Sequence, residues 1–285
     1  MLIDQLENFF EFIADHPQHH ARDTSFYRFI EGITTPAFQE AKSRFESGRD
    51  VAIAELGSVR LPYEKMGAID SIDLFGLDEL LIFAFYYRNR GLYQHAADIG
   101  ANLGLHSIVL SLCGIKVESY EPDPQHYVKL LRNLQLNNIT DCSAHEAAVS
   151  DKESTMQFVR VLANTTSSHL SGSKADPYGD LEHFDVNVKG IRAIAERVDL
   201  LKIDAEGHEA VIIKGMPIDA WKRVDAFVEI GTPENAGLIY DYFVGTGVNI
   251  FSQKCSWARA KSVEDMPFSY KEGGVFVSGK SVMPW

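Results

Sequence analysis

The sequence has few cysteines and no long apolar run. Its three cysteines, Cys113, Cys142 and Cys255, lie far apart, so we expect neither a disulfide framework nor a cysteine metal site. The most apolar window, "LLIFAFYY" at 80–87, is far shorter than the roughly 20 residues that cross a bilayer. Residues 1–17 carry acids where a signal peptide carries Lys and Arg. We therefore expect a cytoplasmic protein without a membrane span.

Basic residues are also scarce. The 285 residues include 27 Lys and Arg against 40 Asp and Glu, which gives a formal net charge of −13. A protein that binds nucleic acid needs a local basic patch to overcome this repulsion, and the sequence contains no such cluster. We therefore expect no nucleic-acid partner.

After residue 93 the sequence alternates between strand-like and helix-like segments. The strand-like segments are "YQHAADIG", "KVESYEP", "CSAHEAAVS", "VDLLKIDA", "RVDAFVEIG", "VNIFSQ" and "GGVFVSG". Helical patterns lie between the early strands, and the last two strands have no helix between them. This order predicts an α/β fold with a Rossmann-like, doubly wound and mainly parallel seven-stranded sheet that ends in an antiparallel hairpin.

The first part of the chain follows a different pattern. Helical spacing predicts one helix over residues 2–13 that stops near Pro17 and another over 36–48, and one or two strands are expected within 51–69. We divide the chain into a mainly helical extension, 1–75, that caps the active site or makes homodimer contacts, and a catalytic domain, 76–285. The polar stretch 163–183 is expected to be a long functional loop.

The stretch "DIGANLG", residues 98–104, follows a strand and opens a helix. Gly100 permits a tight turn and close approach to a ligand, and Gly104 lets the helix begin against the strand. Asn102 stands where a dinucleotide site has a glycine, and the carboxylate of Asp98 would repel a pyrophosphate. An acid here suits a cationic ligand such as S-adenosylmethionine. Glu121, at the end of the next strand, is placed to accept hydrogen bonds from both ribose hydroxyls.

Four stretches in order, "DIGANLGLHS", "YEPDPQHYVKLLRNLQLN", "EAAVSD" and "LLKIDAEGHEAVIIKG", resemble the motifs of the FkbM family of S-adenosylmethionine-dependent methyltransferases. The resemblance covers residues from about 75 to about 230. It implies a methyltransferase sheet and a cofactor site in three parts: Asp98, Gly100, Asn102, Gly104 and Ser107 for the methionine and ribose; Glu121 for the ribose; and Pro122, Asp123, Glu146 and Ala147 around the adenine.

The stretch "LLKIDAEGHE", 200–209, places ionisable groups directly after an apolar strand. Ligands bind at the carboxyl ends of strands in such sheets, so Asp204 is the first candidate for the base that deprotonates a hydroxyl acceptor and Glu206 the second. His208 is the third, because its ordinary pKa lies near 6.5. Each has an alternative: Asp204 orients the cofactor's ammonium, Glu206 caps the next helix, and His208 is a surface histidine.

Other interpretations remain open from the sequence. Lys202 either forms an ion pair with Glu229 or contacts substrate. A divalent metal at Asp204 is considered but not favoured, and His16, His19 and His20 are more typical of exposed histidines than of a metal site. The aromatic side chains of Tyr63, Phe75, Tyr86 and Tyr87 belong either to an acceptor pocket or to the core.

The expected activity is methyl transfer to a hydroxyl of a small molecule, a saccharide or a lipid-linked group. The enzymatic alternative is an NAD-dependent oxidoreductase or epimerase, which Asp98 and Asn102 disfavour. The third hypothesis is a methyltransferase-like scaffold without catalytic activity.

Overall fold

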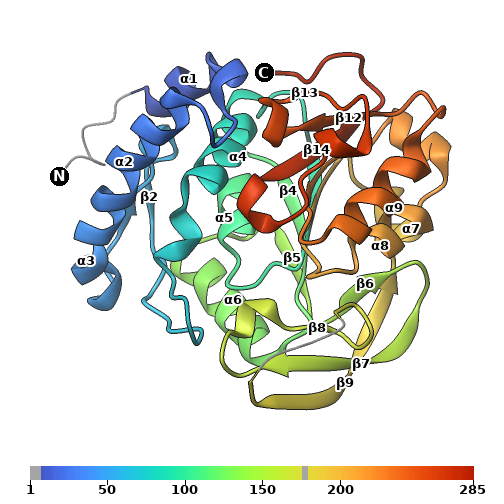
Figure 1. The fold of residues 1–285 in the computed structure, drawn as a ribbon. Coiled ribbons are helices and arrows are strands. Elements are labelled where there is room, and N and C mark those ends of the chain that lie inside the picture. Colours follow the sequence, from blue (N-terminus) through green and yellow to red (C-terminus); the bar gives the residue numbers. More distant parts are fainter. Residues whose placement is uncertain (1–7, 175–178) are drawn as a thin grey trace.

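An eight-stranded mixed sheet runs through the middle of the computed structural model, which describes residues 8–174 and 179–285 (Figure 1). Five neighbouring strands are parallel: β11 (Asp225–Glu229), β10 (Leu200–Ile203), β3 (His95–Ile99), β4 (Lys116–Tyr120) and β5 (Cys142–His145). The order of these strands brings the carboxyl ends of β3, β4, β10 and β11 to one edge of the sheet.

The remaining strands of this sheet are antiparallel. β14 (Gly274–Ser278) lies between β11 and β12 (Asn249–Ser252) and pairs antiparallel with both. The short β13 (Ala258–Arg259) adds an edge strand beside β12. The predicted α/β class, with a mainly parallel sheet and an antiparallel end, is confirmed. β13 is an eighth strand that the apolar pattern did not predict, because both of its residues are exposed.

Helices cover both faces of the sheet. One face carries α4 (Leu77–Arg88), α5 (Leu105–Leu112) and α6 (Pro124–Leu136), and the other carries α7 (Ile191–Ala195), α8 (Glu209–Gly215) and α9 (Pro233–Phe243). Alternation along the strands divides the apolar side chains between two cores. In β10, for example, Leu200 belongs to the first core and Leu201 to the second.

The start of α6 follows the sequence prediction closely. Asp123 is its N-cap and accepts a hydrogen bond from the backbone N–H of Gln125 at 2.8 Å, and Pro124 occupies the first helical position. Proline is tolerated at this position, because the N–H of the first helical residue has no hydrogen-bond partner within the helix. This cap fixes the turn between β4 and α6, where Glu121 and Asp123 lie.

A second sheet, which the sequence did not predict, follows β5. Its order is β6 (Ala148–Ser150), β9 (Leu181–Gly190), β7 (Ser154–Val161) and β8 (His169–Leu170), and it lies at the bottom of Figure 1. The stretch 142–150, expected to be one strand, is divided between the two sheets. The expected loop, 163–183, contains a 3-10 turn at Thr165–Ser167, β8 and the first residues of β9, and its residues 175–178 lie outside the described chain.

The N-terminal extension packs on α4. It contains α1 (Phe9–Ala14), α2 (Ser25–Glu40), α3 (Lys42–Glu46) and the antiparallel pair β1 (Val51–Ala52) and β2 (Ser58–Val59). The first helix was expected from residue 2, and residues 1–7 are outside the described part. The second was expected to begin at Pro36, but Thr24 caps it through the N–H of Tyr27 at 3.1 Å and Pro36 lies inside it.

His20 was expected to be exposed, but it is buried and connects the N-terminal extension to the C-terminal part of the chain. Its imidazole is buried and shares hydrogen bonds with the carbonyl of Ile13 at 2.9 Å and the indole N–H of Trp257 at 3.0 Å. In the described part of the chain, seven further 3-10 turns are short connections: Pro17–His19, Ala54–Leu56, Asp73–Phe75, Ile218–Lys222, Gln253–Cys255, Val263–Asp265 and Tyr270–Glu272.

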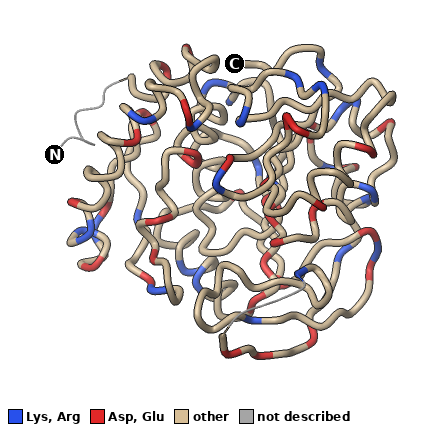
Figure 2. Tube along the Cα trace, viewed as in Figure 1, with Lys and Arg blue, Asp and Glu red and all other residues tan. Residues whose placement is uncertain are grey.

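Of the helices within residues 8–174 and 179–285, none combines the length and apolar character that a membrane span requires. Acidic and basic residues are intermingled along the chain in Figure 2.

Candidate active site

A cavity lies at the carboxyl ends of β3, β4, β10 and β11, with the second sheet on its other side. The described residues that line it include no lysine or arginine but six carboxyl groups: Glu79, Glu121, Asp123, Asp204, Glu206 and Glu229. Those carboxyl groups that are ionised attract a cation and repel an anion. The lining therefore offers negative charge and hydrogen-bond acceptors to a ligand, and no described lysine or arginine to pair with an anion.

Gly100 lines this cavity at the point where the chain turns from β3 toward α5. Its φ is +77°, and a Cβ at this position would lie 1.8 Å from the carbonyl oxygen of Asp204. At Gly104, whose φ is +84°, a Cβ would lie 2.3 Å from Cδ1 of Leu130, a side-chain atom that can move. Gly100 is therefore required by close packing against backbone, and Gly104 mainly by its positive φ. Gly100 and Asn102 line the cavity, whereas Gly104 supports the turn from behind.

Glu121 closes the turn from the next strand. Its carboxylate accepts hydrogen bonds from the backbone N–H of Asn102 at 2.7 Å and of Asp123 at 2.8 Å. Burial raises the pKa of Glu121 to about 8, although both backbone hydrogen bonds act in the opposite direction. The structure thus brings Gly100, Asn102 and Glu121 together, as their positions in the sequence predicted.

Asp98 lies behind this turn, fully buried on β3. Its Oδ2 accepts a hydrogen bond from the hydroxyl of Ser107 at 2.6 Å, and its Oδ1 is buried without a hydrogen-bond donor from the described chain. A buried carboxylate oxygen without a donor costs free energy. Asp98 is not among the described residues that line the cavity, so it supports the turn from behind, and its role at the methionine part of a cofactor stays a prediction.

The residues expected around an adenine ring are not all in one place. Pro122 and Asp123 line the cavity. The carboxylate of Asp123 is held by Arg160 of β7, through Nε at 2.6 Å and Nη2 at 2.7 Å. Glu146 and Ala147 instead line a separate, open hollow between β5 and the second sheet. Their role at the adenine stays a prediction.

Asp204 is the centre of a group of interacting charges. The sequence left Lys202 either an ion pair with Glu229 or a substrate contact, and the structure places its Nζ 3.0 Å from Oδ2 of Asp204 instead. Burial favours a raised pKa for Asp204, but Lys202 and a hydrogen bond with Glu229 lower it overall. The charge of Asp204 and burial raise the pKa of Glu229 well above its ordinary value. The two opposite shifts therefore favour a pair in which Asp204 is ionised and Glu229 holds the shared proton.

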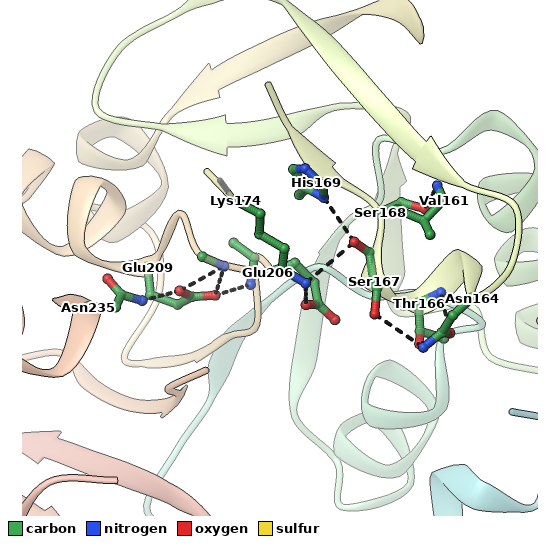
Figure 3. Close-up of polar contacts among 12 residues, drawn as sticks. Val161, Asn164, Thr166, Ser167, Ser168, His169, Lys174, Glu206, Glu209 and Asn235 are labelled. Carbon is green, nitrogen blue, oxygen red and sulfur yellow. Dashed lines mark hydrogen bonds and ion pairs between the residues drawn. The ribbon is translucent and has the colours of Figure 1, made fainter. Parts of the chain in front are cut away.

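Glu206 lies in the turn between β10 and α8 and faces the cavity. Its carboxylate forms an ion pair with Lys174, which approaches from the segment after β8 (Figure 3). Burial and the charge of Asp204 raise the pKa of Glu206 to about 7, against the lowering effect of Lys174. A carboxyl group with a pKa of about 7 is a competent base at neutral pH. The backbone of Glu206 has a φ of +51°, which non-glycine residues rarely adopt.

The turn that presents Glu206 is held by Glu209. The carboxylate of Glu209 accepts hydrogen bonds from the backbone N–H of Ala205 at 2.8 Å and of Gly207 at 3.1 Å, and from the side-chain amide of Asn235 (Figure 3). Glu206 does not cap α8, whose N-cap residue, His208, makes no side-chain cap hydrogen bond, and Glu209 instead holds the turn before the helix.

His208 is neither on the surface nor at the cavity. It is buried, and its ring nitrogens share hydrogen bonds with the hydroxyls of Ser150 at 2.9 Å and Ser173 at 3.1 Å. It is absent from the described residues that line the cavity. Burial lowers its pKa. The imidazole therefore ties the second sheet to the β10–α8 turn, and its catalytic role stays a prediction.

Several cavity residues were missed by sequence reasoning. Glu79 of α4 lines the cavity and shares a 2.7 Å contact with Nε2 of His106. Ile69 and Leu74 come from the N-terminal extension, and the second sheet contributes a group of its own: Phe158, Thr165, Thr166, Ser168, His169 and Leu170. Their positions depend on contacts between distant segments, for which the sequence carries no local signal.

Backbone hydrogen bonds connect the end of the N-terminal extension to the loop after β7. The N–H of Ala68 donates to the carbonyl of Ala163 at 2.8 Å, and the N–H of Thr165 donates to the carbonyl of Met66 at 3.0 Å. A Cβ on Gly67, between them, would lie 2.1 Å from the carbonyl oxygen of Ala163. The end of the extension and the second sheet therefore form one wall of the cavity.

Of the two positions left open for the four aromatic side chains, an acceptor pocket or the core, the structure shows the core. Phe75 and Tyr86 are buried in the first core, and Tyr63 and Tyr87 pack partly buried against it. Within the described ranges, no three His, Cys, Asp or Glu side chains are grouped in a way that holds a metal ion.

The strand order and the acid-lined cavity define an α/β protein with a candidate ligand site at the carboxyl ends of its parallel strands. A sequence model of the methyltransferase FkbM domain matches residues 98–245, just over half of the chain. The chain belongs to the FkbM methyltransferase family, as its motifs predicted. This membership favours methyl transfer over the nicotinamide-dependent alternative.

Two curated relatives have matching names. "Methyltransferase sdnD" of Sordaria araneosa is 26% identical over 197 residues, and the match covers 56% of this chain and 76% of that protein. "Methyltransferase 1" of Beauveria bassiana (strain ARSEF 2860) is 22% identical over 153 residues, covering 46% of this chain and 61% of that protein.

Solved structures with some similarity are also methyltransferases. The precorrin-6Y C5,15-methyltransferase of Geobacter metallireducens GS-15 has 15% identity and a TM-score of 0.38 over 69% of this chain and 85% of that one. The ribosomal protein L11 methylase of Lactobacillus delbrueckii subsp. bulgaricus has 12% identity and a TM-score of 0.39 over 76% and 82%. At these scores the fold class rests on the strand order itself.

Proposed function

We propose that this chain is an S-adenosylmethionine-dependent O-methyltransferase that acts on an uncharged hydroxyl compound: a small molecule, a saccharide or a lipid-linked group. The observation that carries the proposal is the cavity at the strand ends, lined by six carboxyl groups and by no described lysine or arginine. A sulfonium and an ammonium suit this charge, whereas the pyrophosphate of NAD does not.

The residues of the β3 and β4 turns fit such a cofactor. Glu121 lies where a carboxylate accepts hydrogen bonds from ribose hydroxyls, and Gly100 and Asn102 bring backbone to the wall of the cavity. Asp98 supports this turn from behind, through the hydrogen bond that it accepts from Ser107. When bound, the cofactor would supply an electrophilic methyl group on its sulfur.

We assign the proton transfer to Glu206. An acceptor hydroxyl that gains a methyl group must lose its proton, and a base within hydrogen-bond reach lowers the barrier to that loss. With a pKa of about 7, Glu206 is ionised in a large fraction of molecules at neutral pH yet remains basic enough to accept a proton. Asp204, whose pKa is lowered beside Lys202, is a weaker base and serves to hold positive charge at the cavity.

We assign the acceptor to the other side of the cavity. Ile69, Leu74 and Leu170 give that wall an apolar part, and Thr165, Thr166 and Ser168 give it hydroxyls. Lys174 and Lys202 are already paired with carboxylates, which leaves an anionic acceptor without a partner. Because Ile69 and Leu74 belong to residues 1–75, we propose that this extension caps the acceptor site, in preference to a role in a homodimer.

The proposal is tested with methyl-tritiated S-adenosylmethionine and a panel of acceptors. The panel contains matched neutral and acidic hydroxyl compounds, such as a sugar and its uronic acid, together with amines. Transfer of label to neutral hydroxyls supports the proposal, and transfer only to amines or to acidic compounds contradicts it. Protein that binds the cofactor but labels none of the panel, and that also fails to label a whole-cell metabolite extract, would indicate the inactive scaffold.

A further inference from the structure

The segment that follows β8 lies against the catalytic turn. Lys174 extends from this segment, and its ammonium lies between the carboxylate of Glu206 and the carbonyl oxygen of Ser167, which is 3.5 Å away (Figure 3). The side chains of Lys174 and Glu206 are 28% and 31% exposed, so the ion pair is partly shielded from water. Such shielding strengthens the interaction between the two charges compared with a surface pair.

A second contact holds the same segment independently of Lys174. The hydroxyl of Ser173 shares a hydrogen bond with Nδ1 of His208 at 3.1 Å. A Cβ on Gly207, whose φ is +102°, would lie 2.5 Å from the carbonyl oxygen of Ser173. The backbone around Ser173 is thus packed directly on the turn 206–208. Removing the ammonium of Lys174 should therefore leave the segment in place.

The charges around Glu206 come from four parts of the fold: the end of β10, α8, β11 and the segment after β8. Asp204 at the end of β10 and Glu209 on α8 both disfavour its ionised form, and Lys174 favours it. Glu229 on β11 also interacts with Glu206. Lys202, the other cation nearby, is engaged with Asp204 at 3.0 Å. The positive charge of Lys174 therefore opposes the effect of these acidic neighbours on the ionisation of Glu206.

We propose that Lys174 is a positioning residue for Glu206, which holds the carboxylate at the cavity wall and balances the negative charges of Asp204 and Glu209. This inference rests on the proposed function, in which Glu206 is the base. It assigns to the second sheet a part in catalysis, because the sheet brings Lys174 across to a residue of the main fold. An arginine retains the charge at this position, and a methionine retains most of the length without it.

The test follows the ionisation of Glu206 directly and needs no acceptor. Protein labelled with carbon-13 at the glutamate carboxyls is titrated by NMR, and the Glu206 signal is identified by its loss in Glu206→Gln. In Lys174→Met we expect the midpoint to move upward by about one pH unit, and in Lys174→Arg we expect it to stay close to that of the wild type. Lys222→Met, which removes an exposed ion pair with Asp219, is the matched control.

An unchanged Glu206 midpoint in folded Lys174→Met would overturn the inference, as would an equal shift in Lys222→Met. Lys174→Gln provides a second neutral variant, and the thermal melting of each variant is compared with the wild type. Once an acceptor is known, Lys174→Met should shift the pH profile of kcat in the same direction. Full turnover by Glu206→Gln would refute the base assignment alone, because the titration reports on Lys174 independently of turnover.

Discussion

Glu121 illustrates how burial and hydrogen bonding set the chemistry of one residue. Two backbone N–H groups point at its carboxylate, yet burial raises its pKa to about 8. In the ligand-free protein at pH 7 it is therefore mostly protonated. Ribose hydroxyls and a cationic cofactor favour the ionised form, so binding and proton release are linked.

We predict that cofactor affinity rises with pH through about 8, because ionised Glu121 is the form that binds. Glu121→Ala should weaken binding by about 1.5–3 kcal/mol above this pH, since it removes charge-assisted hydrogen bonds. Calorimetric titration with S-adenosylhomocysteine at several pH values measures both effects. The ribose assignment is wrong if affinity and its pH dependence survive the substitution.

Glu206 predicts the pH dependence of turnover. Its pKa is raised to about 7, and the ionised form is the base, so kcat should increase with pH through about 7 and then level off. Glu206→Gln should lower kcat by roughly 100-fold or more. Asp204→Asn is a less clear test, because it also removes the ion-pair partner of the buried Lys202. A flat pH profile in the wild type would argue against Glu206.

Gly100 predicts a steric effect. Gly100→Ala places a Cβ 1.8 Å from the carbonyl oxygen of Asp204, so the two turns must separate, and cofactor binding should be lost. Gly114→Ala is the matched control, because Gly114 has a φ of +80° with nothing near the added Cβ. It should cost only about 1–2 kcal/mol of backbone strain. Equal binding by the two variants would show that the close approach at Gly100 is unimportant.

At the level of elements, the second sheet depends on a buried ion pair. Arg160 of β7 binds Asp123 at the start of α6 and also contacts Glu182 of β9 at 2.5 Å. Its guanidinium lies 4.7 Å from the ring centroid of Phe184. The contacts fix the second sheet relative to the carboxyl end of β4. They explain why Asp123, expected at the adenine, also has a structural role.

We predict that Arg160→Met destabilises the fold by about 3–5 kcal/mol, because it leaves the buried carboxylate of Asp123 without its partner. Urea denaturation measures the free energy of unfolding. Arg60→Met is the control, since the Arg60–Asp50 pair is 43% and 48% exposed, and its loss should cost at most about 1 kcal/mol. Similar values for the two variants would contradict a role for the buried pair.

The elements with regular apolar patterns were predictable. The apolar runs of β10 and β11 and the cap at Asp123 follow from local preferences, so the main sheet and the positions of Gly100 and Glu121 could be inferred. The second sheet was missed because β8 has two residues and β9 buries only Val186 and Val188. His208 and Glu209 were hard to assign, because their surroundings come from Ser150, Ser173 and Asn235 in other elements.

For the whole molecule, charge and function are related. The chain has a net charge of −13, and acids and bases are intermingled along it (Figure 2). The acidic excess is most consequential in the cavity, where six carboxyl groups face a shared space. The central claim is that this space binds S-adenosylmethionine.

Isothermal titration of the purified protein tests that claim most directly. S-adenosylmethionine and S-adenosylhomocysteine are titrated with and without EDTA, and NAD serves as the control. We predict micromolar binding of the first two ligands and none of NAD. The absence of binding by both, in protein that is folded and free of co-purified ligand, would contradict the assignment of this cavity as a cofactor site.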